Sequence, residues 1–200
     1  KGDLAEIPDP AELAEGYVAG GAAAVSVLTE QRRFSGSLHD LDIVRQRVAA
    51  PLLRKDFMVE SYQLYEARAH GADLVLLIVA ALSEAELRAF MNLTDALGMT
   101  ALVEAHTEEE VDRAVEVGAG VIGINNRNLH DFSVSLDTTL NLQKRLPTDR
   151  VTISESGIAG PQDIALLRQG GIHAFLIGEA LMRAPDRKST RLNSSHMSIS

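Results

Sequence analysis

The chain has 200 residues, 46% of them hydrophobic, with a formal net charge of −9 at pH 7 and no cysteine. This is enough apolar sequence for one large core, so one domain is expected, and the lack of cysteine excludes disulfide frameworks, thiolate metal sites and cysteine nucleophiles. Lys and Arg are scattered among acidic residues and no apolar run reaches membrane-spanning length, so we expect no nucleic-acid or membrane partner and a cytoplasmic location.

Short runs rich in Val, Ile and Leu recur along the chain and are typical of strands buried in a parallel sheet. In chain order, the seven runs are residues 23–30, 51–56, 73–79, 101–105, 121–126, 151–156 and 174–178. The segments between them have helical spacing, as in 83–97, where Leu87 and Phe90 share a face. Several of these helices are expected to end at a glycine before the next strand, as at Gly71 and Gly118.

Apolar strands separated by helices form either an open parallel sheet covered on both faces or a closed barrel with an outer ring of helices. One strand and one helix in about 25 residues is typical of the eightfold (βα)8 TIM barrel of about 200 to 250 residues. Because only seven strands are recognisable, we expect an α/β barrel that lacks its first strand. A doubly wound open sheet is the structural alternative.

The last stretch of the chain breaks this pattern. Residues 187–200 are rich in serine and have no helical stripe, so we expect a disordered tail of non-native origin. Residues 1–186 are then expected to form the partial barrel that carries the functional site.

Four expected strands end in a polar residue on the face that points into the barrel, because side chains alternate between the two faces of a strand. These residues, which we call the rim cluster, are Lys55, Glu104, Asn125 and Glu155. They lie at the carboxyl ends of the strands, where barrel enzymes place their active sites. A lysine among carboxylates can act as an acid and a glutamate as a base. A structural ion pair is the alternative for any one of them alone, but their common rim favours catalysis.

Glycines after the last two expected strands indicate a phosphate site. Barrels of the phosphate-binding type hold the phosphate through backbone N–H groups, in the loops after strands seven and eight and at the start of a short helix. Here Gly157, Gly178 and the amide of Glu179 would form this cradle. Ordinary turn glycines are the alternative, and the Glu179 carboxylate would have to turn away from a phosphate.

Three other motifs are excluded by their context. The sequence "GAGVIG" at 118–123 leaves a helix and enters a strand, the reverse of a dinucleotide-binding motif. The sequence "SESGI" lacks the glycine that a nucleophile elbow needs two positions before Ser156. The six histidines have no metal-ligand spacing, and "HTEEE" at 106–110 is a helix start with acids at the positive end of its dipole. We therefore expect no metal.

Together these segments resemble the indole-3-glycerol-phosphate synthase family, from Lys1 to about Asp186. The resemblance implies conversion of 1-(2-carboxyphenylamino)-1-deoxyribulose 5-phosphate to indole-3-glycerol phosphate in tryptophan biosynthesis, with loss of carbon dioxide and water and without a cofactor. The six blocks that carry it, in order, are "VSVLTEQRRFSGSLHDL", "PLLRKDFMVESYQLYEARAHGADLVLLIV", "ALVEAHTEEE", "IGINNRNL", "ISESGI" and "AFLIGEALMRAPD".

The resemblance also implies roles for single residues. The lysine of "RKDF", Lys55, matches the family's general acid, and the glutamate of "LVEA", Glu104, matches its general base. The supporting polar groups are matched by Asn125, Glu155 and Ser156. The positions that match the substrate pocket are Arg127, Phe34, Phe57, Leu76 and Ile78. A small-molecule sugar phosphate is the implied partner, together with fusion to, or association with, other enzymes of the tryptophan pathway.

The start of the chain departs from the family pattern. The family's first strand carries a further lysine and glutamate in a motif that continues into "SPSKG", and an extension helix precedes that strand. Because the chain begins inside this motif, we expect the 200-residue chain to be nearly inactive. The functional alternatives are another sugar-phosphate barrel enzyme, such as a phosphoribosylanthranilate isomerase or a Schiff-base aldolase, and a non-catalytic phosphate-binding module.

Overall fold

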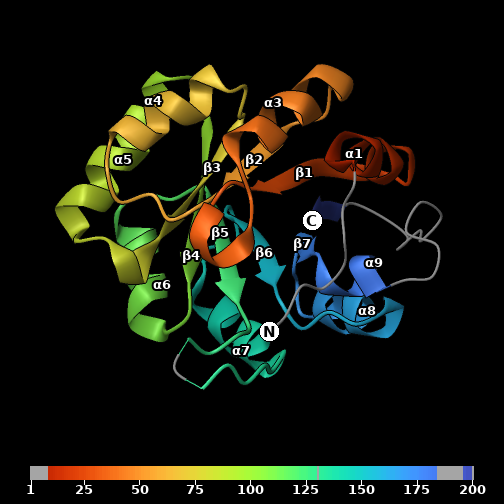
Figure 1. The fold of residues 1–200 in the computed structure, drawn as a ribbon. Helices are drawn as coiled ribbons and strands as arrows, with labels where there is room; N and C mark the ends of the chain where they lie inside the picture. Colours follow the sequence, from red (N-terminus) through yellow and green to blue (C-terminus); the bar gives the residue numbers. More distant parts are fainter. Residues whose placement is uncertain (1–8, 130, 184–195, 200) are drawn as a thin grey trace.

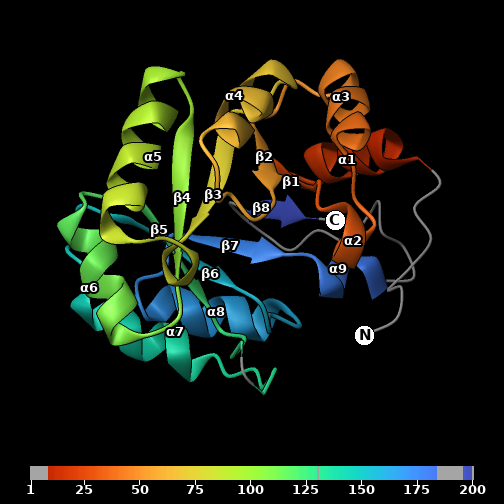
Figure 2. The ribbon, with the colours of Figure 1, turned by 60° about the vertical axis from the view of Figure 1, so that its left-hand side comes forward.

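The computed structural model describes residues 9–129, 131–183 and 196–199. Within these residues, eight parallel strands follow one another in chain order around a closed barrel, and helices lie outside them (Figures 1 and 2). The strands are β1 (Ala22–Leu28), β2 (Leu52–Lys55), β3 (Leu74–Ile78), β4 (Thr100–Ala105), β5 (Val121–Asn125), β6 (Val151–Glu155), β7 (Ala174–Ile177) and β8 (His196–Ile199).

The helices of the described residues begin and end at recognisable signals. The longest, α5, starts with a capping box in which Ser83 and Glu86 satisfy each other's backbone N–H groups. Gly71 and Gly118, each with a φ of +83°, provide the left-handed turns predicted after α4 and α6. The helices are α1 (Pro10–Ala19), α2 (Gln31–Phe34), α3 (Leu38–Arg47), α4 (Tyr62–Ala69), α5 (Glu84–Ala96), α6 (Glu108–Glu116), α7 (Asp137–Leu142), α8 (Pro161–Gln169) and α9 (Glu179–Arg183), with the 3-10 helices η1 (Val79–Ala81) and η2 (Gln143–Arg145).

The seven predicted strands are all present as β1 to β7, and the closed barrel excludes the open doubly wound sheet. β8 lies within the tail for which we predicted disorder, and it fills the place between β7 and β1 that we expected a missing first strand to leave empty. Its backbone groups pair with those of β1 and β7, which provides both strands with hydrogen-bond partners. The structure thus differs from the prediction of disorder at 196–199, whereas 187–195 and 200 lie outside the described residues.

Alternating strand positions separate the core inside the barrel from two hydrophobic clusters outside the sheet. Positions such as Val75 and Val103 face outward and pack beneath the helices. The neighbouring positions face inward and fill the barrel: Ala24, Leu53, Leu76, Ile78, Leu102, Ile153 and Leu176. The last inward position of each strand therefore stands above an apolar floor.

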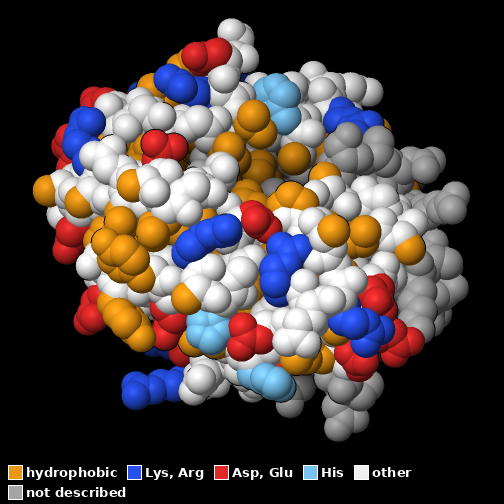
Figure 3. All heavy atoms as spheres, turned by 90° about the horizontal axis from the view of Figure 1, so that it is seen from above, with side chains coloured by type: hydrophobic (Ala, Val, Ile, Leu, Met, Phe, Trp, Pro, Cys, Tyr) orange, Lys and Arg blue, Asp and Glu red, His pale blue; other side chains and the backbone are white. Residues whose placement is uncertain are grey.

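Charges of both signs share the surface. On the face seen in Figure 3, Lys and Arg side chains are interspersed with Asp and Glu side chains, in agreement with the scattered charges of the sequence. Within the described part of the chain, none of the helices combines the length and the apolar character that crossing a membrane requires.

Candidate functional site

The structure brings the rim cluster together at the carboxyl ends of β2, β4, β5 and β6. Lys55 Nζ lies 3.8 Å from Glu104 Oε2 and 3.9 Å from Glu155 Oε2. Asn125 Nδ2 donates a 3.2 Å hydrogen bond to Glu104 Oε1. The lysine side chain is 25% exposed, whereas the two carboxyl side chains are 4% and 1% exposed. A cation with an open side therefore faces two buried carboxyl groups.

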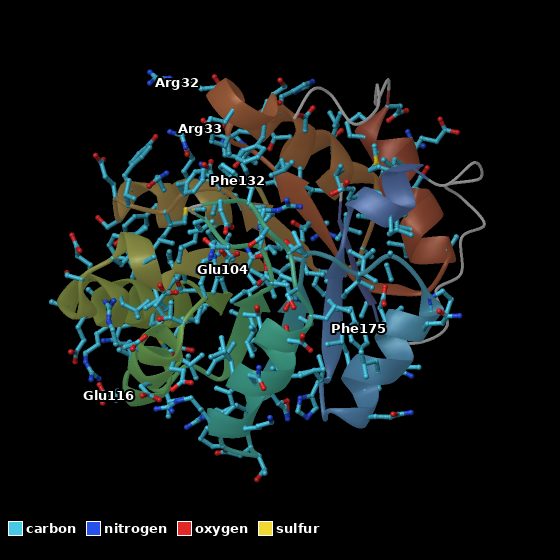
Figure 4. All side chains as sticks on the ribbon, turned by 90° about the horizontal axis from the view of Figure 1, so that it is seen from below. Arg32, Arg33, Glu104, Glu116, Phe132 and Phe175 are labelled. Carbon is cyan, nitrogen blue, oxygen red and sulfur yellow. The ribbon has the colours of Figure 1, made fainter. Side chains whose placement is uncertain are left out.

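Glu104 lies near the centre of the molecule in the view from below, whereas Arg32 and Glu116 lie at its outer border (Figure 4). This central position is the one expected for a side chain that points into a barrel.

Strand register explains the convergence of the rim cluster. Lys55, Asn125 and Glu155 are each the last residue of a strand, and Glu104 is the last but one of β4. Asn125 pairs with Glu155 across β5 and β6, and Glu104 pairs with Gly123. A Cβ atom at Gly123 would lie only 2.0 Å from Glu155 Oε1. Glycine at this position therefore leaves the space that the Glu155 carboxyl group occupies.

The two carboxyl groups have opposite electrostatic environments. Burial raises the pKa of Glu104, but contact with the His106 ring and the charge on Lys55 outweigh burial and lower this pKa to about 2. Burial also raises the pKa of Glu155, and the charge on Glu104 raises it further, to well above the ordinary value, while Lys55 offsets only part of this rise. The pair therefore favours an ionised Glu104 beside a Glu155 that retains its proton.

His106 belongs to the site although we had considered the histidines only as metal ligands. Its side chain is 9% exposed, and its Nε2 lies 3.2 Å from Glu104 Oε1, without the alignment of a hydrogen bond. On its other side, Nδ1 lies 3.1 Å from Glu110 Oε2. Burial lowers the pKa of His106, but the two carboxylates raise it to about 9. The sequence offered only its proximity to Glu104 as a signal, because β4 ends at Ala105 and strand alternation does not extend to His106.

Metal binding has no structural candidate in the part of the chain that the structure describes, where no three or more His, Asp or Glu side chains are grouped to hold an ion.

Two aromatic side chains, one from the short helix α2 and one from the loop after β2, lie next to each other. The rings of Phe34 and Phe57 are stacked with centroids 6.4 Å apart, and the residues are 52% and 40% exposed. Ile78 ends β3 in register with Glu104, at the level of the rim cluster. Leu76 shares its face but lies one inward position deeper, where it is buried in the barrel core. Phe34, Phe57 and Ile78 are thus placed at the rim, and Leu76 in the floor.

Of the predicted phosphate-binding residues, Gly157 lies in the loop after β6, Gly178 in the loop after β7, and Glu179 at the start of α9. Ser156 and Gly157 have φ angles of +65° and +79°, so the chain turns sharply at this point. Gly178 lies between β7 and α9. Arg127 Nη2 lies 3.5 Å from Glu179 Oε2, so the Glu179 carboxylate is directed at a cation from the loop after β5.

A buried network next to Lys55 stabilises the rim loops and was not predicted. Arg54 points away from the barrel interior, and its side chain is 4% exposed. Its guanidinium lies 3.1 Å from Asp56 Oδ2 and 2.9 Å from Glu66 Oε2. Thr29 accepts a 3.0 Å hydrogen bond from Arg54 Nε and donates one of 2.7 Å to Asp56. These bonds connect the ends of β1 and β2 with α4.

Comparisons with known proteins identify a family for the chain. The family model described as indole-3-glycerol phosphate synthase matches residues 1–192. Curated proteins named indole-3-glycerol phosphate synthase include one from Saccharopolyspora erythraea, 54% identical over 94% of this chain and 70% of that protein. Another from a Nocardioides species is 58% identical over 93% of this chain and 72% of that protein.

Solved structures of low sequence identity show the same fold. Thiamine phosphate pyrophosphorylase from Pyrococcus furiosus is similar with a TM-score of 0.70 and 17% identity, covering 91% of this chain and 86% of that chain. The N-acetylmannosamine-6-phosphate 2-epimerase from Clostridium perfringens has a TM-score of 0.67 and 15% identity, covering 85% of this chain and 78% of that chain.

Proposed function

Because the chain belongs to the indole-3-glycerol phosphate synthase family, we propose that the rim cluster is its catalytic centre. The reaction converts the sugar phosphate 1-(2-carboxyphenylamino)-1-deoxyribulose 5-phosphate to indole-3-glycerol phosphate, with loss of carbon dioxide and water. The observation that supports this centre most strongly is Lys55 Nζ at 3.8 and 3.9 Å from two buried carboxyl groups. Lys55 lies at the end of the barrel where (βα)8 enzymes carry their active sites.

Lys55 is proposed as the general acid of ring closure. In this step a carbon of the aromatic ring attacks the ketone carbon of the sugar chain, and the carbonyl oxygen takes up a proton as the new bond forms. The lysine ammonium group can give that proton, and its partial exposure of 25% makes it accessible to a bound substrate. Departure of the carboxyl group as carbon dioxide then restores the aromatic ring.

Glu104 is proposed as the general base of dehydration. This step removes the proton on nitrogen while the hydroxyl group takes up a proton and leaves as water. The pKa of Glu104, about 2, keeps this carboxylate ionised and able to accept a proton at neutral pH, and Asn125 holds its Oε1 by a hydrogen bond. Glu155, which keeps its proton more readily, is proposed as a supporting polar group together with Asn125.

The two ends of the substrate are proposed to bind at different parts of the rim. The aromatic end fits beside the stacked rings of Phe34 and Phe57, with Ile78 below them. The phosphate end would bind in the cradle formed by Gly157, Gly178 and the amide of Glu179. The polar side chains of Arg127 and Ser156 would assist this binding.

The test is turnover of the substrate by variants of Lys55 and Glu104, followed by the fluorescence of the indole product. Lys55→Met and Glu104→Gln should each lower the rate by about 100- to 10,000-fold, the usual contribution of an acid or base. Lys144→Met is the matched control, since Lys144 is exposed and contacts Asn141. Each rate is expressed relative to the rate of the unchanged chain. The same assay also measures the turnover of the unchanged chain, which we predict to be low.

Each alternative function has a distinct result in this assay. Full turnover by Lys55→Met would show that Lys55 is not the acid. Reduction with borohydride in the presence of a keto-sugar phosphate would label Lys55 in a Schiff-base aldolase and leave it unmodified in a synthase. A binding module would bind substrate equally well with and without the two substitutions, and would form no product.

The location and partners of the protein are proposed from the family alone. We expect the protein to be located in the cytoplasm and to associate with other enzymes of the tryptophan pathway. Co-purification from a native source tests the association.

A further inference from the structure

Lys55 by itself does not distinguish between the two buried carboxyl groups of the site. Its Nζ lies 3.8 Å from Glu104 Oε2 and 3.9 Å from Glu155 Oε2. At nearly equal distances the lysine charge attracts both carboxylates to the same degree. Two neighbouring buried carboxyl groups do not readily ionise together, so another group must determine which of them carries the charge.

His106 distinguishes them, because it lies beside one carboxyl group of the pair. In the described residues, the ion pairs of His106 are with Glu104 at 3.2 Å and with Glu110 at 3.1 Å. By contrast, the close neighbours of the Glu155 carboxyl group in the described residues are Lys55 and the Glu104 carboxyl group itself. Glu104 is therefore in contact with two cations and an amide donor, whereas the ion pair of Glu155 in the described residues is with the lysine that both share, and the charge of His106 acts on Glu155 more weakly.

Glu110 holds His106 in this position. Its Oε2 accepts a 2.7 Å hydrogen bond from the backbone N–H of His106 and lies 3.1 Å from the ring Nδ1. The backbone N–H of Glu110 is itself bonded to the hydroxyl group of Thr107 in the first turn of α6. The ring is thus fixed from behind by a carboxylate that also favours its charged form.

We propose that His106, held by Glu110, is a positioning residue that makes Glu104 rather than Glu155 the ionised carboxyl group of the site. This inference rests on the proposed function, in which Glu104 is the base. The titratable groups that face His106 are Glu104 from β4 and Glu110 from α6, with Lys55 and Glu155 behind Glu104. Without the imidazolium, the two carboxyl groups would compete for one proton on nearly equal terms.

The ionisation of the carboxyl groups can be measured without turnover. In the unchanged chain labelled with carbon-13, NMR titration of the glutamate carboxyl signals gives a midpoint for each, and Glu104→Gln and Glu155→Gln identify the two signals. In His106→Gln we expect the Glu104 midpoint to rise by about 1 to 3 pH units, the usual effect of an adjacent charge. The Glu155 midpoint should move less, because His106 contacts Glu104 directly and Glu155 only at longer range.

His70→Gln is the matched control. His70 also contacts a carboxylate, Asp42, at 2.7 Å, but at the outer surface, so its removal should move neither midpoint. If His106→Gln does not fold, Glu110→Gln provides the test, since it keeps the ring and removes its support. It should lower the midpoint of His106 and raise that of Glu104. An unmoved Glu104 midpoint in the variant that folds overturns the proposal.

Turnover separates this inference from the proposed function. If Glu104 is the base, His106→Gln should move the acid limb of the kcat/KM profile to higher pH, so that turnover is lost in acid at a higher pH than in the unchanged chain. If Glu104→Gln leaves turnover unchanged, the proposed function fails, while the NMR midpoints still decide which carboxyl group His106 ionises.

Discussion

A methyl group at residue 123 tests whether the space left for the Glu155 carboxyl group matters to the site. In Gly123→Ala, the added Cβ would lie 2.0 Å from Glu155 Oε1 and 3.1 Å from Leu102 Cδ1. Since real Cβ atoms essentially never approach another atom within 3.0 Å, the carboxyl group must move. Glu155 is 1% exposed, so no open space is next to it.

The expected cost follows from overpacking and from the displaced carboxyl group. Overpacking of a filled interior costs about 1–3 kcal/mol, and each kcal/mol lowers the Tm of a chain of this size by about 2–4 °C. We therefore expect the Tm to fall by about 2–12 °C. The movement also changes the 3.9 Å distance from Glu155 to Lys55, and a misplacement of about 1 Å costs about 100-fold in rate.

Thermal unfolding followed by circular dichroism and kcat with the natural substrate are the two measurements. Gly120→Ala is the matched control, because Gly120 lies one residue before β5 and an added Cβ there meets no atom within 4 Å. Its stability should change by less than about 0.5 kcal/mol.

Combining Gly123→Ala with Glu155→Ala identifies the source of the cost. Removing the carboxyl group makes room for the methyl group, so the second substitution should restore much of the lost Tm. A Gly123→Ala protein with the Tm and kcat of the unchanged chain would refute the reasoning, because the Glu155 carboxyl group could then not occupy the place described.

Two further predictions concern charge. Arg54→Met leaves the partly buried carboxylates of Asp56 and Glu66 without their cation, so we expect a loss of about 1–3 kcal/mol in the free energy of unfolding by urea. A loss well below about 1 kcal/mol would show that these contacts stabilise no more than an exposed ion pair does. The pKa of His106 is raised from 6.5 to about 9, so its stabilisation is complete below pH 6.5 and is lost as the pH rises through about 9. The Tm difference between the unchanged chain and His106→Gln should therefore shrink over that range, and a constant difference would contradict a charged His106.

Strand periodicity was enough to predict which side chains enter the barrel. Lys55 and Glu104 point inward because side chains alternate along a strand, and they meet because parallel strands end on the same side. Periodicity gives the face of the strand but not the height along the barrel. The family resemblance grouped Leu76 with Ile78 as a pocket residue, whereas the structure places it one layer deeper in the core.

Contacts between different elements could not be predicted in the same way. β4 ends at Ala105, so strand periodicity does not extend to His106, whose orientation depends on Glu110 in the next helix. Arg54 likewise finds Asp56 in a loop and Glu66 on α4. The composition of the last residues predicted disorder at 196–199. The pairing of these residues with β1 and β7 could not be predicted from composition, because it depends on strands far away in the sequence.

The position of β8 affects how one copy of the protein meets another. A strand whose backbone groups lack a neighbour can serve as a template for the strand of another molecule, which is a common route to aggregation. Here β8 joins β7 to β1, so each strand of the described residues has a neighbour on both sides. The four residues His196–Ile199 thus shield the seam of the barrel from self-association.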